Sequence, residues 1–381
     1  MDIIYFDNSA SAIPCAEALK TFAETAQIYA NPSSPHSPGL ASRRMLEEAR
    51  RTLASAVRCM PGELFFTSGG TESNNIALRG CARKNRHAGD VIVTTKAEHP
   101  SVAQTVASLV REGFRPVYIS ARGGEPDYGE LENVLKAEKV CLVALMQANN
   151  QNGAVTDLKK VRGCITASAS KALFHSDCVQ AFLKLPDGMA GYAFEYCDTA
   201  SFSAHKIGGI KGSGALFVRK GLVLPGLFCG GEQENGVRPG TENLPGICAF
   251  AKAASLFGAE KRKRLSELRV YLISSLRGKL GENIAIAEPE LHIDSLVNVS
   301  LKNVKSEVAL NHLNSLGICV SSSSACSSKA KTNTALASLG YGEAYDMSAI
   351  RIGISPQNTE KEIDALVSGL KECLSFRIKG K

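Results

Sequence analysis

The sequence predicts an α/β protein with a large, mainly parallel seven-stranded sheet and a smaller α/β unit near the C-terminus. Short apolar runs alternate with helical patterns through the first two-thirds of the chain, and a second, shorter alternation follows a long charged segment. The length of 381 residues suits two units, at about 100–200 residues per domain. With 44% apolar and 21% charged residues, the composition excludes disordered, collagen-like and coiled-coil chains.

The elements of the large unit follow from these runs. The expected strands are 63–67, 91–95, 115–119, 139–146, 172–176, 198–203 and 214–218. The expected helices are 16–29, 40–58, 72–86, 99–112, 128–137 and 157–169. Strands that alternate with helices form a parallel sheet covered on both faces. We therefore expect a large domain over residues 14–258.

The second unit begins after a turn-rich passage, 225–245, which is too long for an ordinary connection and is therefore expected to be functional. A single charged helix is expected over 246–279. Strands at 295–301, 317–321 and 348–354 and helices at 306–316, 332–339 and 359–376 complete the pattern. We expect a small domain made of residues 259–381 together with 1–13.

The charge balance limits the partners. The chain has 44 basic and 37 acidic residues, a net charge of +7, which is mild for this length and does not indicate direct nucleic-acid binding. The basic run Lys261–Arg264 is expected to be a solvated helix face. No apolar run approaches the length of a membrane helix, and the acidic start is unlike a secretory signal, so we expect a cytoplasmic protein.

Twelve cysteines occur without metal-ligand spacing, and most stand in apolar stretches where a thiol packs as a small hydrophobic group. Without a secretory signal, free thiols in a reducing compartment are expected. Cys326 differs, because it lies in the small polar stretch Val320-Ser-Ser-Ser-Ser-Ala-Cys-Ser-Ser328.

Three strand ends carry residues suited to an anionic cofactor. Thr67-Ser-Gly-Gly-Thr-Glu-Ser-Asn74 ends a strand and opens a helix, a place where backbone N–H groups bind phosphate, although an ordinary glycine turn fits the same residues. Asp177 ends the strand at 172–176 and suits either a ligand contact or a helix cap. Lys206 lies between a strand and the glycine-rich run Ile207-Gly-Gly-Ile-Lys-Gly-Ser-Gly214.

A phosphate site, a strand-end carboxylate and such a lysine are the three parts that pyridoxal phosphate needs. Lysine forms the Schiff base, the carboxylate keeps the pyridine nitrogen protonated, and the helix N-terminus holds the phosphate. His99 follows another strand and is placed to stack on the ring, although a lone histidine is more often structural. Asn150 ends a further strand and is placed to bond the ring oxygen.

At this point nearly the whole chain resembles the cysteine desulfurases of the class V aminotransferase family, which supply sulfur for iron–sulfur clusters. The matching segments are Tyr5-Phe-Asp-Asn-Ser-Ala10, Asn31-Pro-Ser-Ser34, Phe66–Ser73, Glu98-His99, Asn149-Asn150, Asp177 with Gln180, Ser203-Ala-His-Lys206, Arg238-Pro-Gly-Thr241 and Ser323-Ser-Ala-Cys326. The loop at Cys326 resembles the group whose cysteine lies on a long mobile loop. Gln147 and Gln151 replace the family's usual His and Glu, and Ser323 replaces a usual Gly.

The resemblance implies pyridoxal-phosphate fold type I and a homodimer with active sites at its interface. It implies that Gly70, Thr71, Ser203 and His205 bind the phosphate, and that Thr241 reaches the phosphate of the partner subunit. Gln180 would lie near the ring oxygen, and Arg351 with Asn150 would bind the substrate carboxylate. No resident metal is implied, although Cys326 could transiently ligate a cluster held by a partner.

The resemblance further implies conversion of L-cysteine to L-alanine. Lys206 would move the Cα proton, His99 would move protons at the substrate thiol, and Cys326 would take the sulfur as a persulfide. The acceptor is open between an iron–sulfur scaffold, a tRNA-thiolation enzyme and another carrier. A selenocysteine lyase, another class V aminotransferase-family enzyme and a catalytically silent scaffold or regulatory homologue remain as alternatives.

Overall fold

The structure is a computed structural model that describes residues 3–186, 189, 192–322 and 334–377. Its largest sheet has seven strands in the order β2-β8-β7-β6-β5-β3-β4. These strands are β2 (Leu64–Thr67), β3 (Val91–Thr95), β4 (Arg115–Ile119), β5 (Val140–Ala144), β6 (Leu173–Asp177), β7 (Thr199–Ser203) and β8 (Gly214–Val218). Only β8 is antiparallel to its neighbours. The predicted mainly parallel seven-stranded sheet is therefore confirmed.

Side-chain alternation along these strands creates two apolar layers. In β3, Val91 and Val93 join one buried cluster while Ile92 joins the other, because successive strand residues face opposite sides of the sheet. On one face lie α3 (Gly70–Lys84) and α4 (Pro100–Leu109). The other face packs against α2 (Ser37–Val57), α5 (Tyr128–Ala137), α6 (Leu158–Ala167) and α8 (Leu244–Ser255), with α1 (Ala16–Ala26) against α8. The helix α7 (Ala193–Tyr196) precedes β7.

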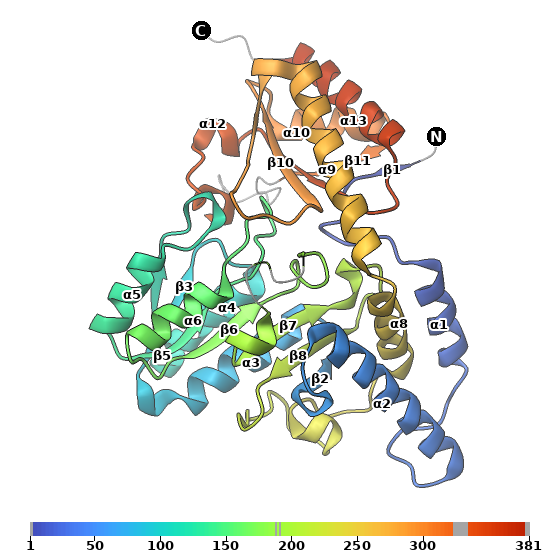
Figure 1. Cartoon of the computed structure of the whole chain (residues 1–381), viewed down its shortest axis with the longest axis vertical. Helices are drawn as coiled ribbons and strands as arrows, with labels where there is room; N and C mark the ends of the chain where they lie inside the picture. The colour runs from blue at the N-terminus through green and yellow to red at the C-terminus, as the bar shows by residue number, and fades with distance from the viewer. Residues whose placement is uncertain (1–2, 187–188, 190–191, 323–333, 378–381) are drawn as a thin grey trace.

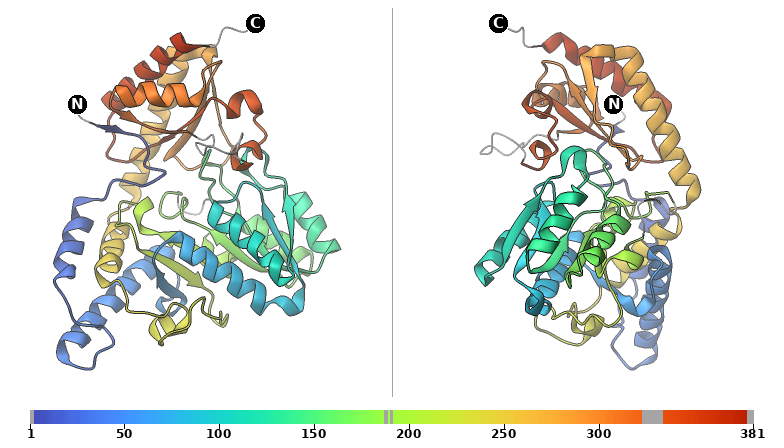
Figure 2. Two further views of the ribbon diagram at one scale, coloured as in Figure 1. Left: turned by 180° about the vertical axis from the view of Figure 1, so that it is seen from behind. Right: turned by 60° about the vertical axis from the view of Figure 1, so that its left-hand side comes forward.

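A second sheet lies above the first in Figure 1, with strand order β12-β13-β10-β9 and antiparallel pairing throughout. Its strands are β9 (Ile284–Ile286), β10 (Leu296–Leu301), β12 (Ser321–Ser322) and β13 (Ala349–Gly353). The helices of this part are α9 (Ala259–Leu280), α10 (Ser306–Ser315), α11 (Thr334–Ala337), α12 (Glu343–Asp346) and α13 (Glu360–Cys373). Figure 2 shows α9 running from this upper part down to the large sheet.

The N-terminal segment joins the upper part. The strand β1 (Ile4–Tyr5) pairs in parallel with β11 (Ile318–Cys319), and Asn8 donates a hydrogen bond of 3.0 Å to the carbonyl of Gly353. The predicted division into two domains stays a prediction, although this pairing agrees with grouping residues 1–13 with the C-terminal unit.

Two predicted elements are wrong. The expected single helix over 246–279 is two helices, α8 and α9, because Gly258 adopts an extended conformation and begins a new helix. The expected strand over 317–321 is split, since β11 pairs with β1 while β12 turns to pair with β13. Residues 332 and 333 of the expected helix 332–339 lie outside the described residues. Elsewhere in the large unit the predicted boundaries agree to within about three residues.

The short elements β1, β9, α7 and α12 have no counterpart in the prediction. None of the described helices is long and apolar enough to span a membrane.

Candidate active site

Ten of the twelve predicted site residues line a single cavity of about 410 Å³. They are Gly70, Thr71, His99, Asn150, Asp177, Gln180, Ser203, His205, Lys206 and Arg351. Their meeting follows from the topology, because the carboxyl ends of parallel strands lie at one edge of a sheet. The strands β2, β3, β5, β6 and β7 each lead into one of these stretches, and only Arg351 comes from the second sheet.

The N-terminus of α3 forms one wall of the cavity. Gly69 has a φ of +150°, a conformation that favours glycine, and a Cβ at Gly70 would lie 2.5 Å from Val179. Gly214 also needs its lack of a side chain, because a Cβ there would lie 2.5 Å from the Cα of Gly69. The free N–H groups at the start of this 15-residue helix therefore face the cavity without covering side chains, a geometry that suits a phosphate.

Lys206 lies at the end of the short 3-10 turn Ala204–Lys206 that follows β7. Its Nζ donates hydrogen bonds of 2.6 Å to the carbonyl of Ser9 and 2.8 Å to the carbonyl of Ala10. Burial, with a further contribution from Arg351, lowers the pKa of Lys206 to about 8. A lysine amine with a lowered pKa is partly neutral near pH 7, the form needed for attack on a carbonyl or removal of a proton.

Asp177 is held by a donor on each oxygen. Its Oδ1 accepts a bond of 3.0 Å from the backbone N–H of Val179, and its Oδ2 accepts one of 2.7 Å from Asn74. These two donors fix the orientation of the carboxyl group. The bond to Val179 is the helix-cap type of contact that the sequence left open, and Asp177 lines the cavity as well.

Asn74 also orients His99. Its Nδ2 donates to Ser101 Oγ at 2.8 Å, which leaves the Ser101 hydroxyl hydrogen to donate to His99 Nδ1 at 2.8 Å. The backbone N–H of Ser101 donates to the same nitrogen at 3.1 Å. With Nδ1 accepting twice, the proton of a neutral His99 lies on Nε2. Burial lowers the pKa of His99, which favours that neutral form.

The network continues into the core through His175. Its Nε2 lies 3.0 Å from Asn74 Oδ1, which can only accept, so Nε2 donates and Nδ1 accepts from Thr199 Oγ1 at 2.9 Å. Burial lowers the pKa of His175 to about 3, consistent with a neutral ring. Both His175 and Asn74 are at most 1% exposed. They fix the position of Asp177 from below the cavity.

Sequence reasoning missed Asn74, Ser101 and His175, although their positions carried a signal. Asn74 is one helical turn after Gly70, and so shares its face. His175 stands two residues before Asp177 on one strand, and so points to the same side of the sheet.

Two polar atoms in the cavity wall lack partners among the described residues, namely Asn150 Oδ1 and Arg351 Nε. The remaining nitrogens of Arg351 donate to the carbonyl of Asn150 at 3.1 Å and to Asp7 at 3.3 Å. Buried polar atoms that have no partner in the protein are positions where a ligand or a water can form hydrogen bonds. An acceptor beside a guanidinium suits a ligand that carries both a hydroxyl and a carboxylate.

Of the remaining predicted residues, some line the cavity, one lies outside it and others lie outside the described residues. His205 lies 3.3 Å from Ser11 Oγ, and burial lowers the pKa of His205 to about 4. Gln180 donates to the carbonyl of Ser9 at 2.9 Å. Thr241 is exposed and lies outside the cavity in this single chain. Cys326 lies outside the described residues, as does Ser323. Gln151 is buried, and its Oε1 has no partner among the described residues.

The eleven cysteines within the described ranges are all free. Burial raises the pKa of the Cys81 and Cys178 thiols to about 12, as expected for cysteines that pack as apolar groups. Cys229 is the exposed cysteine among those within the described ranges. Within those ranges no group of three or more His, Cys, Asp or Glu residues could hold a metal ion.

Comparison with known proteins defines the class. The family described as "Aminotransferase class-V" matches residues 4–366, and the chain belongs to this family. A "NifS/IcsS protein homolog" of Lactobacillus delbrueckii subsp. bulgaricus is 34% identical, with 97% of each chain covered. "Cysteine desulfurase 2" of Trichormus variabilis is 33% identical, with 96% of this chain and 92% of the relative covered.

Solved structures agree with the fold. A "NIFS-LIKE PROTEIN" superposes with a TM-score of 0.89 at 32% identity, covering 98% of this chain and 100% of the other. A structure described as "SspA in complex with cysteine" gives a TM-score of 0.78 at 26% identity, covering 93% and 99%. The expected fold type is thereby confirmed.

Proposed function

We propose that this protein is a pyridoxal-phosphate-dependent cysteine desulfurase that converts L-cysteine to L-alanine and takes the sulfur on Cys326. One observation carries the proposal. Lys206, Asp177, His99 and Arg351 come from separate stretches of a chain that is about one-third identical to named cysteine desulfurases along nearly its whole length, and they line one cavity.

The residues present fit pyridoxal phosphate. The uncovered N-terminus of α3, with Thr71, Ser203 and His205, suits the phosphate, and Asp177 suits the protonated ring nitrogen. The unpartnered Asn150 Oδ1 and the side chain of Gln180 suit the ring hydroxyl, while His99 suits ring stacking. When bound, the cofactor supplies the electron sink for negative charge that develops at Cα and Cβ of cysteine.

The protein's own groups would then bind, orient and move protons. Arg351 would bind the carboxylate of cysteine, because its Nε lacks a partner among the described residues and its planar fork matches two oxygens. The partly neutral amine of Lys206 would move the Cα proton. His99 Nε2 would give its proton to a group on the substrate and would then take a proton back.

Sulfur transfer needs no external oxidant. The thiolate of Cys326 would bond to the substrate sulfur as the carbon–sulfur bond breaks, and a proton would replace sulfur on Cβ. The balance is cysteine plus a protein thiol giving alanine plus a protein persulfide. The small polar residues around Cys326 in the sequence support this role, because burial among apolar side chains would raise the pKa of a thiol and leave little thiolate.

The proposal also covers the oligomeric state, the location and the sulfur acceptor of the enzyme. A homodimer would bring Thr241 of one subunit to the cofactor phosphate of the other, which accounts for its exposure outside the cavity here. We place the enzyme in the cytoplasm, where a sulfur acceptor protein such as an iron–sulfur scaffold or a tRNA-thiolation enzyme would receive the persulfide sulfur.

A single-turnover experiment tests the proposal. The cofactor-loaded protein is mixed with L-cysteine, alanine is quantified, and peptides are examined by tandem mass spectrometry. We expect one extra sulfur atom on Cys326 in proportion to alanine. Cys326→Ser should form neither product, whereas Cys229→Ser, which alters an exposed thiol elsewhere in the chain, should form both.

Two outcomes would contradict it. Sulfur on Cys229 with normal alanine release by Cys326→Ser would remove Cys326 as the nucleophile. Alanine release from L-selenocysteine but not from L-cysteine would identify a selenocysteine lyase instead.

A further inference from the structure

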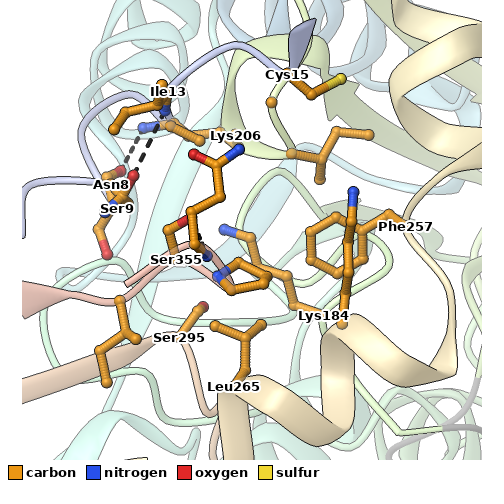
Figure 3. A pocket seen from close by; sticks show the side chains of 17 residues that line it. Asn8, Ser9, Ile13, Cys15, Lys184, Lys206, Phe257, Leu265, Ser295 and Ser355 are labelled. Carbon is orange, nitrogen blue, oxygen red and sulfur yellow. Dashed lines mark hydrogen bonds between the residues drawn. The ribbon is translucent and has the colours of Figure 1, made fainter. Parts of the chain in front are cut away.

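A second cavity lies behind Lys206, on the side away from the candidate active site. One side of the cavity is lined by the N-terminal segment and by the turn after β6, which carries Lys184 (Figure 3). The other side is lined by the start of α9 and by residues next to the ends of β10 and β13. The volume of the cavity is about 50 Å³. Since one water needs about 10–15 Å³, this space holds about four non-hydrogen atoms. Lys206 and Ser9 line both cavities, so this one shares a wall with the candidate active site.

The charged side chains that line this second cavity are all basic among the described residues. Lys184, Lys206 and Lys261 line it, and no Asp or Glu is among the described residues that do so. Lys206 is held by the carbonyls of Ser9 and Ala10, and Lys261 lies near the ring of Phe257. Asp177 and Asp7 attract the Lys206 amine from outside the cavity, so Lys184 and Lys261 are the lining amines that no lining carboxylate among the described residues neutralises.

Lys184 is the least satisfied of these amines. It is 5% exposed, and its only hydrogen bond within the described ranges is one of 3.2 Å to the neutral Oε1 of Gln180. Burial, with a further contribution from Lys206, lowers the pKa of Lys184 to about 7. A buried ammonium group with one neutral acceptor is costly unless an anion joins it.

The opposite wall also holds an unpartnered donor. Ser295 is 4% exposed, and its Oγ has no partner among the described residues. Figure 3 shows the side chains of Lys184 and Ser295 directed into the same space, with Phe257 and Leu265 beside them. An ammonium group and a hydroxyl match the two oxygens of a carboxylate, and the apolar side chains suit a methyl group.

We propose that this cavity is a second ligand site, which binds a monocarboxylate of acetate size between Lys184 and Ser295. The site is linked to the candidate active site through Gln180, which bonds both Lys184 and the carbonyl of Ser9 that also holds Lys206. Occupancy therefore acts on the position of Gln180 and Lys206 from behind. The proposal concerns binding, and it does not rest on the activity proposed above.

Binding is measured by saturation-transfer NMR on the acetate methyl group with the cofactor-loaded protein at constant ionic strength. Acetamide has the same shape without the charge, and phenylacetate is too large for the cavity. We expect saturable transfer to acetate and at least about tenfold weaker binding of both comparison compounds. Equal binding of acetate and acetamide would overturn the proposal, and this arm uses the unaltered protein.

Variants locate the binding. Lys184→Met should weaken acetate binding at least about tenfold, Ser295→Ala should weaken it severalfold, and Lys171→Met, at an exposed lysine, should leave it unchanged. The competing location for acetate is the candidate active site, where Arg351 Nε has no hydrogen-bond partner among the described residues. If Arg351→Met abolishes acetate binding while Lys184→Met retains it, acetate binds at Arg351 and the second site is refuted.

Discussion

The two sheets contribute to the candidate active site in different ways. The seven-stranded sheet supplies nine of the ten lining residues that the sequence predicted, from the last residues of strands and from the turns and helix starts that follow them. The four-stranded sheet supplies Arg351 alone, from the middle of β13, between the fully buried Ile350 and Ile352. A residue held within a strand has less freedom than one in a turn.

This difference separates two tasks. The residues beyond the large sheet surround the place that fits the cofactor, while Arg351 reaches it from the other part of the molecule with a nitrogen that lacks a partner among the described residues. Changes in the large sheet should therefore alter the cofactor's absorption spectrum, and a change at Arg351 that keeps its charge, and with it the effect on the pKa of Lys206, should alter substrate affinity alone. The predictions below test that separation.

The largest effect is expected for Lys206→Ala. Activity should fall to background and the absorption band of the covalently bound cofactor should disappear, because no other described lysine lines the candidate active site. Reduction of the wild type with borohydride followed by peptide mapping should place the cofactor on Lys206. Lys211→Ala is the matched control. Cofactor found on Lys211 or Lys184 would show that the large sheet positions a different amine.

Asp177→Asn should retain the cofactor but lower kcat by about 100-fold or more, the scale seen when a charge-stabilising group is removed. An amide cannot hold a protonated ring nitrogen, so the cofactor spectrum should shift as well. Asp157→Asn is the control, because Asp157 caps α6 far from the cavity and asparagine caps equally well. Unchanged activity and spectrum in Asp177→Asn would reduce Asp177 to a helix cap.

Arg351→Lys should raise KM for L-cysteine about 10- to 100-fold, since a hydrogen bond to a charged group contributes about 1.5–3 kcal/mol. The cofactor spectrum without substrate should match the wild type. Arg277→Lys, on the exposed side of α9, should change neither quantity. A spectral change in Arg351→Lys would break the separation between the two sheets.

Asn74→Ala should reduce kcat severalfold and lower the free energy of unfolding by about 1–3 kcal/mol, because Asp177, Ser101 and His175 each lose a buried partner. The pH dependence of the cofactor absorbance should shift as well, a readout that a purely structural role would not move. Asn75→Ala, the neighbouring residue that bonds Thr71 and Thr105, is the control for lost stability. An unshifted pH profile would leave Asn74 with a structural role only.

The smallest effect concerns Glu98, which follows β3 and is 3% exposed. Burial raises its pKa from 4.5 to about 8, so the folded protein keeps a proton that the unfolded chain releases within that window. The free energy of unfolding should therefore fall as pH rises from about 5 to 8. Glu98→Gln should flatten this slope and Glu260→Gln, at an exposed carboxylate, should not. A slope in Glu98→Gln equal to that of the wild type would contradict the assignment.

The features that could be predicted from the sequence are those that a short stretch of residues determines. Strands such as 91–95 and 214–218, which are rich in β-branched or apolar residues and buried on both faces, have the bounds that the sequence predicts. Lys206 and Asp177 could be found because a strand end places residues at a known edge. The hydrogen-bond partners of these residues could not be found from the sequence, because the bond between Asn74 and Asp177 joins positions 103 residues apart. The break between α8 and α9 was missed because a single glycine inside a helical pattern is often tolerated.

The pairing of β1 with β11 has a consequence for the order of synthesis. The carbonyls that hold Lys206 belong to Ser9 and Ala10, which precede every strand of the seven-stranded sheet in the chain. The neighbours that fix this stretch, Ile318 and Gly353, are made more than 300 residues later. A nascent chain can complete its seven-stranded sheet before the strand partner of the segment that holds the Lys206 amine has been synthesised. The candidate active site is therefore among the last parts of the molecule to form.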